Sequence, residues 1–328
     1  MSRAPNLVYF PDTRPGIRRR RCGRGFSYTA PDGTRIDDRA ERARIAALAV
    51  PPAYEDVWIC PRANGHLQAT GRDARARKQY RYHPDWTAFR AERKFAHLAE
   101  FGAALPALRR RILADLRSHD PGERSFALAA VLALLDRAGL RVGNAGYAKE
   151  NRTFGATTLR GAHMQLDGDA LHLRFPGKGG KPVDQVLRDH TLNRALTRLD
   201  DLPGQDLLGW LDETGAPHGI RSEEVNAFLA DRTGNDRLTA KTFRTWTGTV
   251  AALDAALRPG PASIKAMAEA AAERLHNTPA IARKSYIHPE VIALADLDEA
   301  ARQERTADAR DIPGLRRTEV RLLHLLGG

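Results

Sequence analysis

The hydrophobic pattern of the chain changes near residue 90, and this change constrains the fold more than any other feature. Before it, the short apolar run of residues 57–60 is followed by the turn-forming pair Asn64-Gly65 and by an expected return strand over residues 66–70, which is typical of a hairpin. After it, apolar residues recur at helical spacing over longer segments. The pattern predicts an α+β fold, with a small β-rich N-terminal domain over residues 1–90 and a larger, mostly α-helical domain over residues 91–328.

The first strong helical segment of the larger domain has a broad apolar face between Phe126 and Leu135. Asp120-Pro121 is expected to begin this helix, because Asp is a good N-cap and Pro is tolerated at the first helical position. Gly139 is expected to end it. A helix with so wide an apolar face should be buried, and Arg141 should lie just past its end.

A small β-sheet is predicted as an insertion among the helices. Residues 163–166 and 170–175 flank Asp167-Gly168, a hairpin turn, and residues 182–187 supply a third strand. Helices are expected again after Thr239, over residues 264–275 and in the C-terminal ~40 residues.

The composition indicates a polyanionic partner. The 328 residues include 52 Lys and Arg against 40 Asp and Glu, a net charge of +12, so DNA, RNA or an anionic membrane surface could bind. No apolar stretch reaches 18 residues and residues 1–12 do not resemble a secretory signal, so no membrane association is expected. The two cysteines are too few for a disulfide framework or a four-cysteine zinc site, and no metal is predicted. Abundant Arg, Ala, Gly and Pro indicate a bacterial, cytoplasmic protein, which would be nucleoid-associated if its partner is DNA.

Two cations stand in positions that favour phosphate binding. Lys178 is flanked by glycines in Phe175-Pro176-Gly177-Lys178-Gly179-Gly180-Lys181, although this is not a P-loop, because Gly179 stands where Ser or Thr would bind magnesium. Arg141 directly follows the buried helix, and a rigidly held guanidinium group matches two phosphate oxygens. Each residue taken alone is more often a solvated surface cation.

Two further segments could add to a phosphate site. Lys241 and Arg244 are three residues apart, so on a helix they share a face. Tyr286 follows Arg283 and Lys284, and neighbouring cations lower the pKa of a phenol that acts as a nucleophile. Most such helices and most tyrosines are structural.

The order of these residues carries more information than any one of them. Arg141, Lys178, Arg244 and Tyr286 follow one another with spacings that resemble the type IB DNA topoisomerases, the poxvirus and bacterial branch in particular. The resemblance covers nearly the whole chain, through Arg141-Val142-Gly143, Tyr147-Ala148-Lys149-Glu150-Asn151, Phe175-Pro176-Gly177-Lys178, Lys241-Thr242-Phe243-Arg244-Thr245-Trp246 and Asn277-Thr278-Pro279 running to Lys284-Ser285-Tyr286.

The resemblance implies an enzyme that relaxes supercoiled DNA without metal, ATP or any other cofactor. Tyr286 would attack a phosphodiester and form a 3′-phosphotyrosyl bond, while Lys178 would protonate the departing 5′ oxygen. Arg141 and Arg244 would hold the non-bridging oxygens. The chemistry requires such a set, because the transition state gathers negative charge and the 5′ alkoxide is a poor leaving group unless it is protonated.

The resemblance departs from the poxvirus and eukaryotic pattern at one position. Those enzymes place a histidine nine residues before the nucleophile, where this chain has Asn277. An asparagine amide donates the same hydrogen bond without the charge. His276 is adjacent but is expected to point elsewhere, because one step along a helix end changes the direction of the side chain. The alternative role for Asn277 is to cap the turn before Thr278-Pro279.

The resemblance also implies that duplex DNA is the partner of a monomeric protein. Residues 1–90 would form half of a clamp around the duplex, with cations on phosphates and other side chains at base edges or sugars. The DNA-contacting residues implied are Arg72, Lys78, Gln79, Tyr80, Tyr82, Tyr147 and Lys241.

Two alternatives are less well supported. A tyrosine recombinase uses the same chemistry on a related fold, but its signature has a histidine three residues before the second arginine, where this chain has Lys241. Recombinases also carry a helical N-terminal clamp rather than a β-rich one. A non-enzymatic DNA-binding protein would need no order among the motifs.

Overall fold

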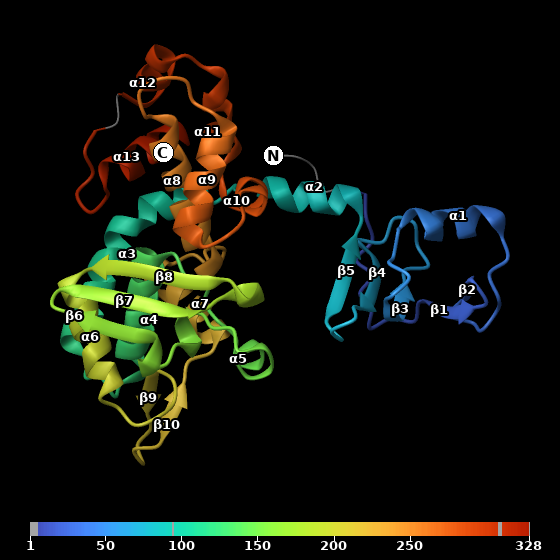
Figure 1. Cartoon of the computed structure of the whole chain (residues 1–328), viewed down its shortest axis with the longest axis horizontal. Coiled ribbons are helices and arrows are strands. Elements are labelled where there is room, and N and C mark those ends of the chain that lie inside the picture. Colours follow the sequence, from blue (N-terminus) through green and yellow to red (C-terminus); the bar gives the residue numbers. More distant parts are fainter. Residues whose placement is uncertain (1–5, 94, 308–309, 328) are drawn as a thin grey trace. The chain divides into compact units, whose positions relative to one another are not determined.

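The computed structural model describes residues 6–93, 95–307 and 310–327, apart from the side chains of residues 91–93 and 147. The chain divides into two compact units, Met1–Ala96 and His97–Gly328 (Figure 1). Strands dominate the first unit and helices the second, which confirms the predicted α+β class.

The N-terminal unit is built on a five-stranded antiparallel sheet with strand order β2-β1-β3-β4-β5. A helix, α1 (Arg39–Ala47), connects β2 to β3, and α2 (Pro84–Arg93) follows β5. The strands are β1 (Ile17–Cys22), β2 (Gly25–Thr29), β3 (Glu55–Ile59), β4 (Leu67–Arg72) and β5 (Lys78–Tyr82).

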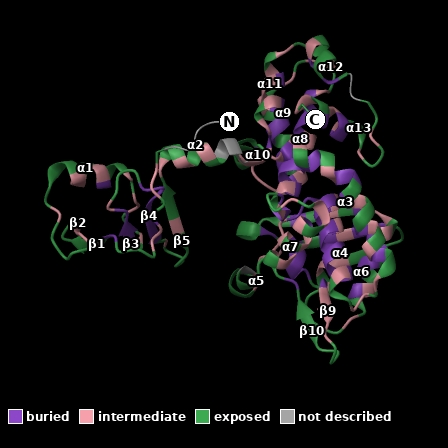
Figure 2. Ribbon diagram, turned by 180° about the vertical axis from the view of Figure 1, so that it is seen from behind, coloured by how far each residue is buried: buried purple, intermediate pink, exposed green. Residues whose placement is uncertain are grey.

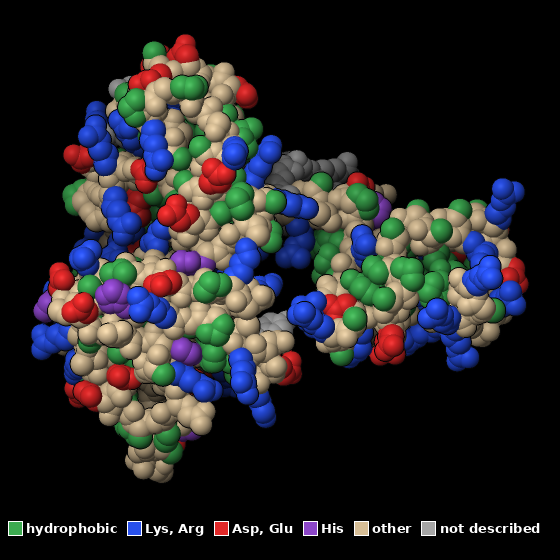
Figure 3. All heavy atoms as spheres, in the orientation of Figure 1, with side chains coloured by type: hydrophobic (Ala, Val, Ile, Leu, Met, Phe, Trp, Pro, Cys, Tyr) green, Lys and Arg blue, Asp and Glu red, His purple; other side chains and the backbone are tan. Residues whose placement is uncertain are grey.

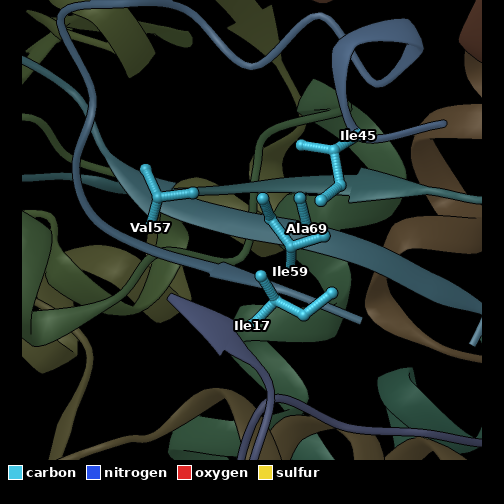
Figure 4. Close-up of a cluster of buried hydrophobic side chains, with 5 residues drawn as sticks. All are labelled: Ile17, Ile45, Val57, Ile59 and Ala69. Atoms are coloured by element: carbon cyan, nitrogen blue, oxygen red, sulfur yellow. The ribbon is translucent and has the colours of Figure 1, made fainter. Parts of the chain in front are cut away.

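The two faces of this sheet bury different sets of side chains, because side chains alternate between faces along a strand. One face carries a core that includes Ile45 of α1 (Figure 4), whose members are Ile17, Ile45, Val57, Ile59 and Ala69. The other face buries Phe10, Trp58, Cys60 and Leu67, so the segment before β1 covers part of it. Tyr80 and Tyr82 of β5 lie on this second face and remain exposed, so its outer part is called the open face below.

The predicted pairing of the strands near residues 57–70 is confirmed, but the predicted two-residue turn at Asn64-Gly65 is wrong. β3 ends at Ile59 and β4 begins at Leu67, so a longer loop joins them. Gly65 forms a bridge with Val8, which diverts the loop toward the N-terminal segment. The buried amide of Gln68 donates to three carbonyl groups of the loop and holds it in this shape.

The second unit is mostly helical. Its longer helices are α3 (Leu98–Ser118), α4 (Arg124–Ala138), α6 (His190–Asp200), α7 (Ser222–Thr233), α8 (Ala240–Ala256) and α9 (Ile264–Leu275). Its shorter ones are α5 (Ala145–Asn151), α10 (Pro279–Tyr286), α11 (Pro289–Ala293), α12 (Glu299–Ala307) and α13 (Arg317–Leu325). The predicted helices after Thr239, over residues 264–275 and near the C-terminus are therefore confirmed.

Helix α4 is the buried helix that the sequence predicts, and Figure 2 shows its buried surface. It begins at Arg124, so the predicted start at Asp120-Pro121 is wrong. Residues 119–122 form a turn instead, in which the Glu123 carboxylate accepts a hydrogen bond from the Asp120 N–H at 2.8 Å. Gly139 ends the helix in the left-handed conformation, as predicted, with φ 63°.

The inserted sheet has the predicted three strands, β6 (Met164–Asp167), β7 (Ala170–Pro176) and β8 (Pro182–Arg188), in sequential order. Asp167 pairs with Ala170, so the tight loop consists of Gly168 and Asp169, one residue later than predicted. A second, two-stranded sheet, β9 (Gly209–Leu211) and β10 (Pro217–Gly219), was not predicted, because strands of three residues give no periodic signal.

None of the helices in the described part of the chain combines the length and the apolar character needed to cross a membrane. Lys and Arg side chains are spread over both units in Figure 3, interspersed with fewer acidic ones.

Candidate active site

Arg141 lies just past the end of α4, and residues 155–157 hold its backbone in place. The Arg141 carbonyl accepts a hydrogen bond from the Ala156 N–H at 2.8 Å, and the Val142 carbonyl accepts one from the Thr157 N–H at 2.7 Å. Gly155 permits this contact, because a Cβ there would lie 2.6 Å from the Arg141 carbonyl oxygen. Burial lowers the pKa of Arg141, although the Tyr286 phenol acts in the opposite direction. Arg141 thus has a fixed backbone and a partly desolvated guanidinium group.

Arg244 connects the ends of two helices. It lies on α8 with 4% of its surface exposed. Its two terminal nitrogens donate to the carbonyl groups of Gly139, after α4, and Leu275, at the end of α9. Its Nε is buried and has no hydrogen-bond partner among the described residues. Burial lowers the pKa of Arg244 to about 10, so it remains a cation at neutral pH, with a donor left over for an anion.

Tyr286, the last residue of α10, lies against Arg244, whose Cζ is 5.1 Å from the centre of the phenol ring. Burial by itself would raise the pKa of Tyr286, but the charges of Arg244, Arg141 and Lys241 outweigh it and lower the pKa below its usual value. Residues that are far apart in the sequence thus combine to favour the phenolate, which is the form of tyrosine that attacks phosphorus.

The backbone of Tyr286 packs against Gly248 of α8, a residue that the sequence did not single out. A Cβ on Gly248 would lie 2.8 Å from the Tyr286 carbonyl oxygen and 3.0 Å from its Cβ, so only glycine allows this approach. The Thr249 hydroxyl lies 3.0 Å from the same carbonyl oxygen and accepts a hydrogen bond from the His288 N–H at 3.2 Å. A glycine inside a helix is costly, which is the sequence signal that could have pointed to this contact.

Asn277 is half-buried, and among the described residues only the oxygen of its side-chain amide forms a hydrogen bond. Its Oδ1 accepts a hydrogen bond from the Thr278 N–H at 3.0 Å. Its Nδ2 is buried and has no partner among the described residues. Native structures rarely leave a buried donor unpaired unless a ligand uses it. Asn277 and Arg244 both present such a donor.

His276 lines a small cavity together with Arg141 and Arg244, so the expectation that its side chain points elsewhere is wrong. It ends α9 in the left-handed conformation, with φ 48°, so the regular rotation of a helix no longer sets its direction. Burial and the charges of Arg244, Arg274 and Arg141 lower the pKa of His276, which keeps the imidazole neutral at neutral pH.

Lys178 lies at the tip of the β7–β8 hairpin and is exposed. Gly177, the first residue of the turn, lines the same cavity as Arg141 and Arg244, so the start of the turn borders the site. The side chain of Lys178 is not part of that lining. A side chain at such a tip is free to turn toward a bound substrate.

The residues predicted to bind DNA lie at several places. β5 directs Lys78, Tyr80 and Tyr82 to one face, and Gln79, whose amide donates to Asp73, to the other. Arg72 is exposed at the end of β4. In the helical unit Lys241 lies one turn before Arg244 on α8. The side chain of Tyr147 lies outside the described residues.

The site therefore joins a phenol of lowered pKa to fixed cationic donors. Such an arrangement can stabilise a phosphorane-like transition state while the phenolate attacks phosphorus. In the described ranges no group of three or more His, Cys, Asp or Glu side chains is placed to hold a metal ion.

Comparison with known proteins agrees with this chemistry. Residues 25–73 match the family described as the bacterial DNA topoisomerase IB N-terminal domain, and residues 84–283 match the catalytic core of eukaryotic DNA topoisomerase I. The chain is 26% identical over 287 residues to DNA topoisomerase 1B of Acanthamoeba polyphaga mimivirus, covering 83% of this chain and 85% of the relative. It is 22% identical over 252 residues to DNA topoisomerase 1B of vaccinia virus strain Copenhagen, covering 74% and 76%. Since the core family alone spans more than half of the chain, the protein belongs to the type IB DNA topoisomerases.

Proposed function

We propose that this topoisomerase relaxes supercoiled DNA through a 3′-phosphotyrosyl intermediate formed by Tyr286. The observation that supports this most directly is the contact of Tyr286 with Arg244, together with the charge of Arg141, which also acts on the phenol. Both cations are partly or fully buried, which strengthens their effect on a phosphate. The oxygen of Tyr286 would form a bond to phosphorus as the bond from phosphorus to the 5′ oxygen breaks. The phenol proton would leave to water, and Lys178 would protonate the 5′ oxygen.

Each remaining site residue has a defined part in this proposal. Arg141, the Nε of Arg244 and the Nδ2 of Asn277 would hold the non-bridging oxygens. The last two donors have no hydrogen-bond partner within the described ranges of the chain. Religation is the reverse step, in which the 5′ hydroxyl attacks the phosphotyrosyl bond. Because the ester conserves the energy of the broken phosphodiester, the cycle needs no ATP.

The N-terminal unit would bind the duplex. We propose contacts from Arg72, Lys78, Tyr80 and Tyr82, supported by their exposure on the open face of the sheet, with Gln79 contributing at the edge of β5. Lys241 and Tyr147 would bind DNA from the helical unit. The enzyme would act as a monomer on the nucleoid of a bacterial cytoplasm.

The direct test is relaxation of a negatively supercoiled plasmid in EDTA and without ATP. Relaxation should proceed, and rapid denaturation should trap protein on a 3′ DNA end. Relaxation that requires Mg²⁺ or ATP would contradict the proposal. Products recombined between two defined sites would support the tyrosine recombinase alternative instead.

Gly248→Ala should slow DNA cleavage about tenfold to a hundredfold at saturating DNA, because the added methyl group must displace the Tyr286 backbone. Single-turnover cleavage below the melting temperature measures this, and DNA affinity should stay near that of the wild type. The matched control is Gly122→Ala, where the nearest atom to the new Cβ is 3.7 Å away. An unchanged cleavage rate in Gly248→Ala would show that the contact does not position the nucleophile.

Asn277→Ala should slow cleavage by roughly 10²-fold, the usual cost of losing one donor to a transition-state oxygen. Asn277→His should keep most of the activity, because the imidazole N–H replaces the donor.

If Asn277 only caps the turn, Asn277→Ala should lower the melting temperature but leave the cleavage rate of the folded enzyme near normal. Ser263→Ala provides the control, because Ser263 caps α9 by accepting from the Ala266 N–H. That variant should lower the melting temperature without changing single-turnover cleavage.

A further inference from the structure

A row of aromatic rings runs along the open face of the N-terminal unit. Tyr80 and Tyr82 stack at 6.1 Å between ring centres, with 11° between the ring planes. Tyr82 contacts His66 at 6.3 Å, and His66 stacks on Tyr9 at 4.5 Å and 22°. These four residues are called the aromatic row below. Tyr9 extends the aromatic row beyond β4 and β5, the strands whose residues are expected to bind DNA.

Tyr9 is held in place by its backbone neighbours. The Val8 N–H donates to the Asn64 carbonyl at 2.9 Å, and the His66 N–H donates to the Val8 carbonyl at 2.9 Å. The Phe10 N–H donates to Nδ1 of His66 at 3.0 Å, so the ring on which Tyr9 stacks is oriented by the same segment. Phe10 itself is buried against Trp58. The Tyr9 ring is therefore fixed before any partner binds.

This fixed ring is nevertheless open to solvent. Tyr9 is 68% exposed, Tyr80 49% and Tyr82 39%. In the part of the chain that the structure describes, these tyrosines are three of the six large hydrophobic residues with this degree of exposure. A cluster of exposed rings in one unit is more than the scattered apolar residues of an ordinary surface, and it indicates a binding surface.

The cations beside the row define the chemistry of the partner. Lys78 lies on the same face of β5 and places its Nζ 5.7 Å from the centre of the Tyr80 ring. Arg72 pairs with Lys78 across the sheet and is exposed. Rings with adjacent cations match a sugar–phosphate backbone, because deoxyribose is apolar and the phosphates flank it.

We propose that Tyr9 is a DNA-contacting residue whose ring packs on a deoxyribose of the duplex, at the end of the aromatic row away from Tyr80. The proposal rests on the proposed role of the N-terminal unit in DNA binding and extends its footprint to the segment before β1. A sugar is the expected target, because base faces are stacked inside a duplex and closed to an aromatic side chain. Pre-ordering by His66 reduces the entropy lost on binding.

The test measures the affinity of the full-length protein for a series of duplexes shortened from either end by single base pairs. Tyr9→Ala should bind the longest duplex roughly fivefold to tenfold more weakly, the lower range for losing a nucleotide-stacking ring. Tyr9→Phe should bind like the wild type. On a duplex too short to reach Tyr9, Tyr9→Ala and the wild type should bind with equal affinity, because neither protein can then make this contact.

Salt dependence supplies a second measurement on the same variants. Tyr9→Ala should keep the wild-type slope of log affinity against log salt, because a ring releases no counterions. Lys78→Ala should flatten that slope. A deficit of Tyr9→Ala that persists at every duplex length would overturn the proposal, because it would show that Tyr9 only supports the fold of the unit.

Tyr80→Ala separates this inference from the proposed function. Weaker binding by Tyr80→Ala together with normal binding by Tyr9→Ala would refute the contact of Tyr9 alone. Normal binding by both variants and by Lys78→Ala would refute the DNA-binding role of the open face itself.

Discussion

Tyr286→Phe is expected to bind duplex DNA with nearly wild-type affinity and to form no covalent adduct. The substitution removes the only oxygen that the side chain offers for attack on phosphorus and leaves the ring against Arg244 in place. Relaxation should fall by roughly 10⁴-fold or more, because the remaining donors cannot act in concert without a nucleophile. Adduct trapping on a duplex labelled at the 5′ end of the cleaved strand, together with binding by gel shift, measures both properties.

Tyr54→Phe is the matched control for this experiment. It removes the same hydroxyl group from a tyrosine that packs against the core of the N-terminal unit, outside the proposed DNA contacts, and it should keep full adduct formation. A trapped adduct in Tyr286→Phe would show that another tyrosine attacks the DNA and would remove α10 from the chemistry.

Lys178→Ala is expected to slow cleavage of an ordinary phosphodiester by about 10²- to 10⁴-fold, the range for loss of a positioned general acid. A substrate with sulfur in place of the 5′-bridging oxygen should restore most of the rate, because a thiolate leaves without protonation. Single-turnover cleavage of the two substrates gives the ratio directly.

The control for Lys178 comes from the same hairpin. Lys181 is also exposed, on the other side of Gly179 and Gly180, and Lys181→Ala should cleave both substrates at nearly the wild-type rate. If sulfur gives no rescue in Lys178→Ala, Lys178 binds the substrate rather than protonating it. Lys241, whose charge acts on Tyr286, would then be the next candidate for the acid.

Much of the architecture is encoded in local sequence. The α+β division, the buried helix that ends at Gly139 and the three-stranded insertion follow from apolar periodicity and turn residues, which act over a few positions. Local signals failed at two places, once because a distant segment contacts the loop and once because a nearby side chain competes for the start of the helix. The loop at Asn64-Gly65 bridges to Val8, and the predicted start of α4 at Asp120 became a turn closed by Glu123.

The sequence by itself determined which residue types could perform the chemistry and in what order they occur, because Arg141, Lys178, Arg244 and Tyr286 are recognisable from their neighbours and spacing. Only the tertiary structure decided how they act on one another. The lowered pKa of Tyr286 requires cations from two segments other than its own, and Arg244 is oriented by carbonyl groups at the ends of α4 and α9. The fit of Gly248 against Tyr286, the turn of His276 into the site and the place of Tyr9 in the aromatic row are likewise contacts between segments distant in sequence. Periodicity and propensity describe a residue and its near neighbours, and such contacts form only when the chain has folded.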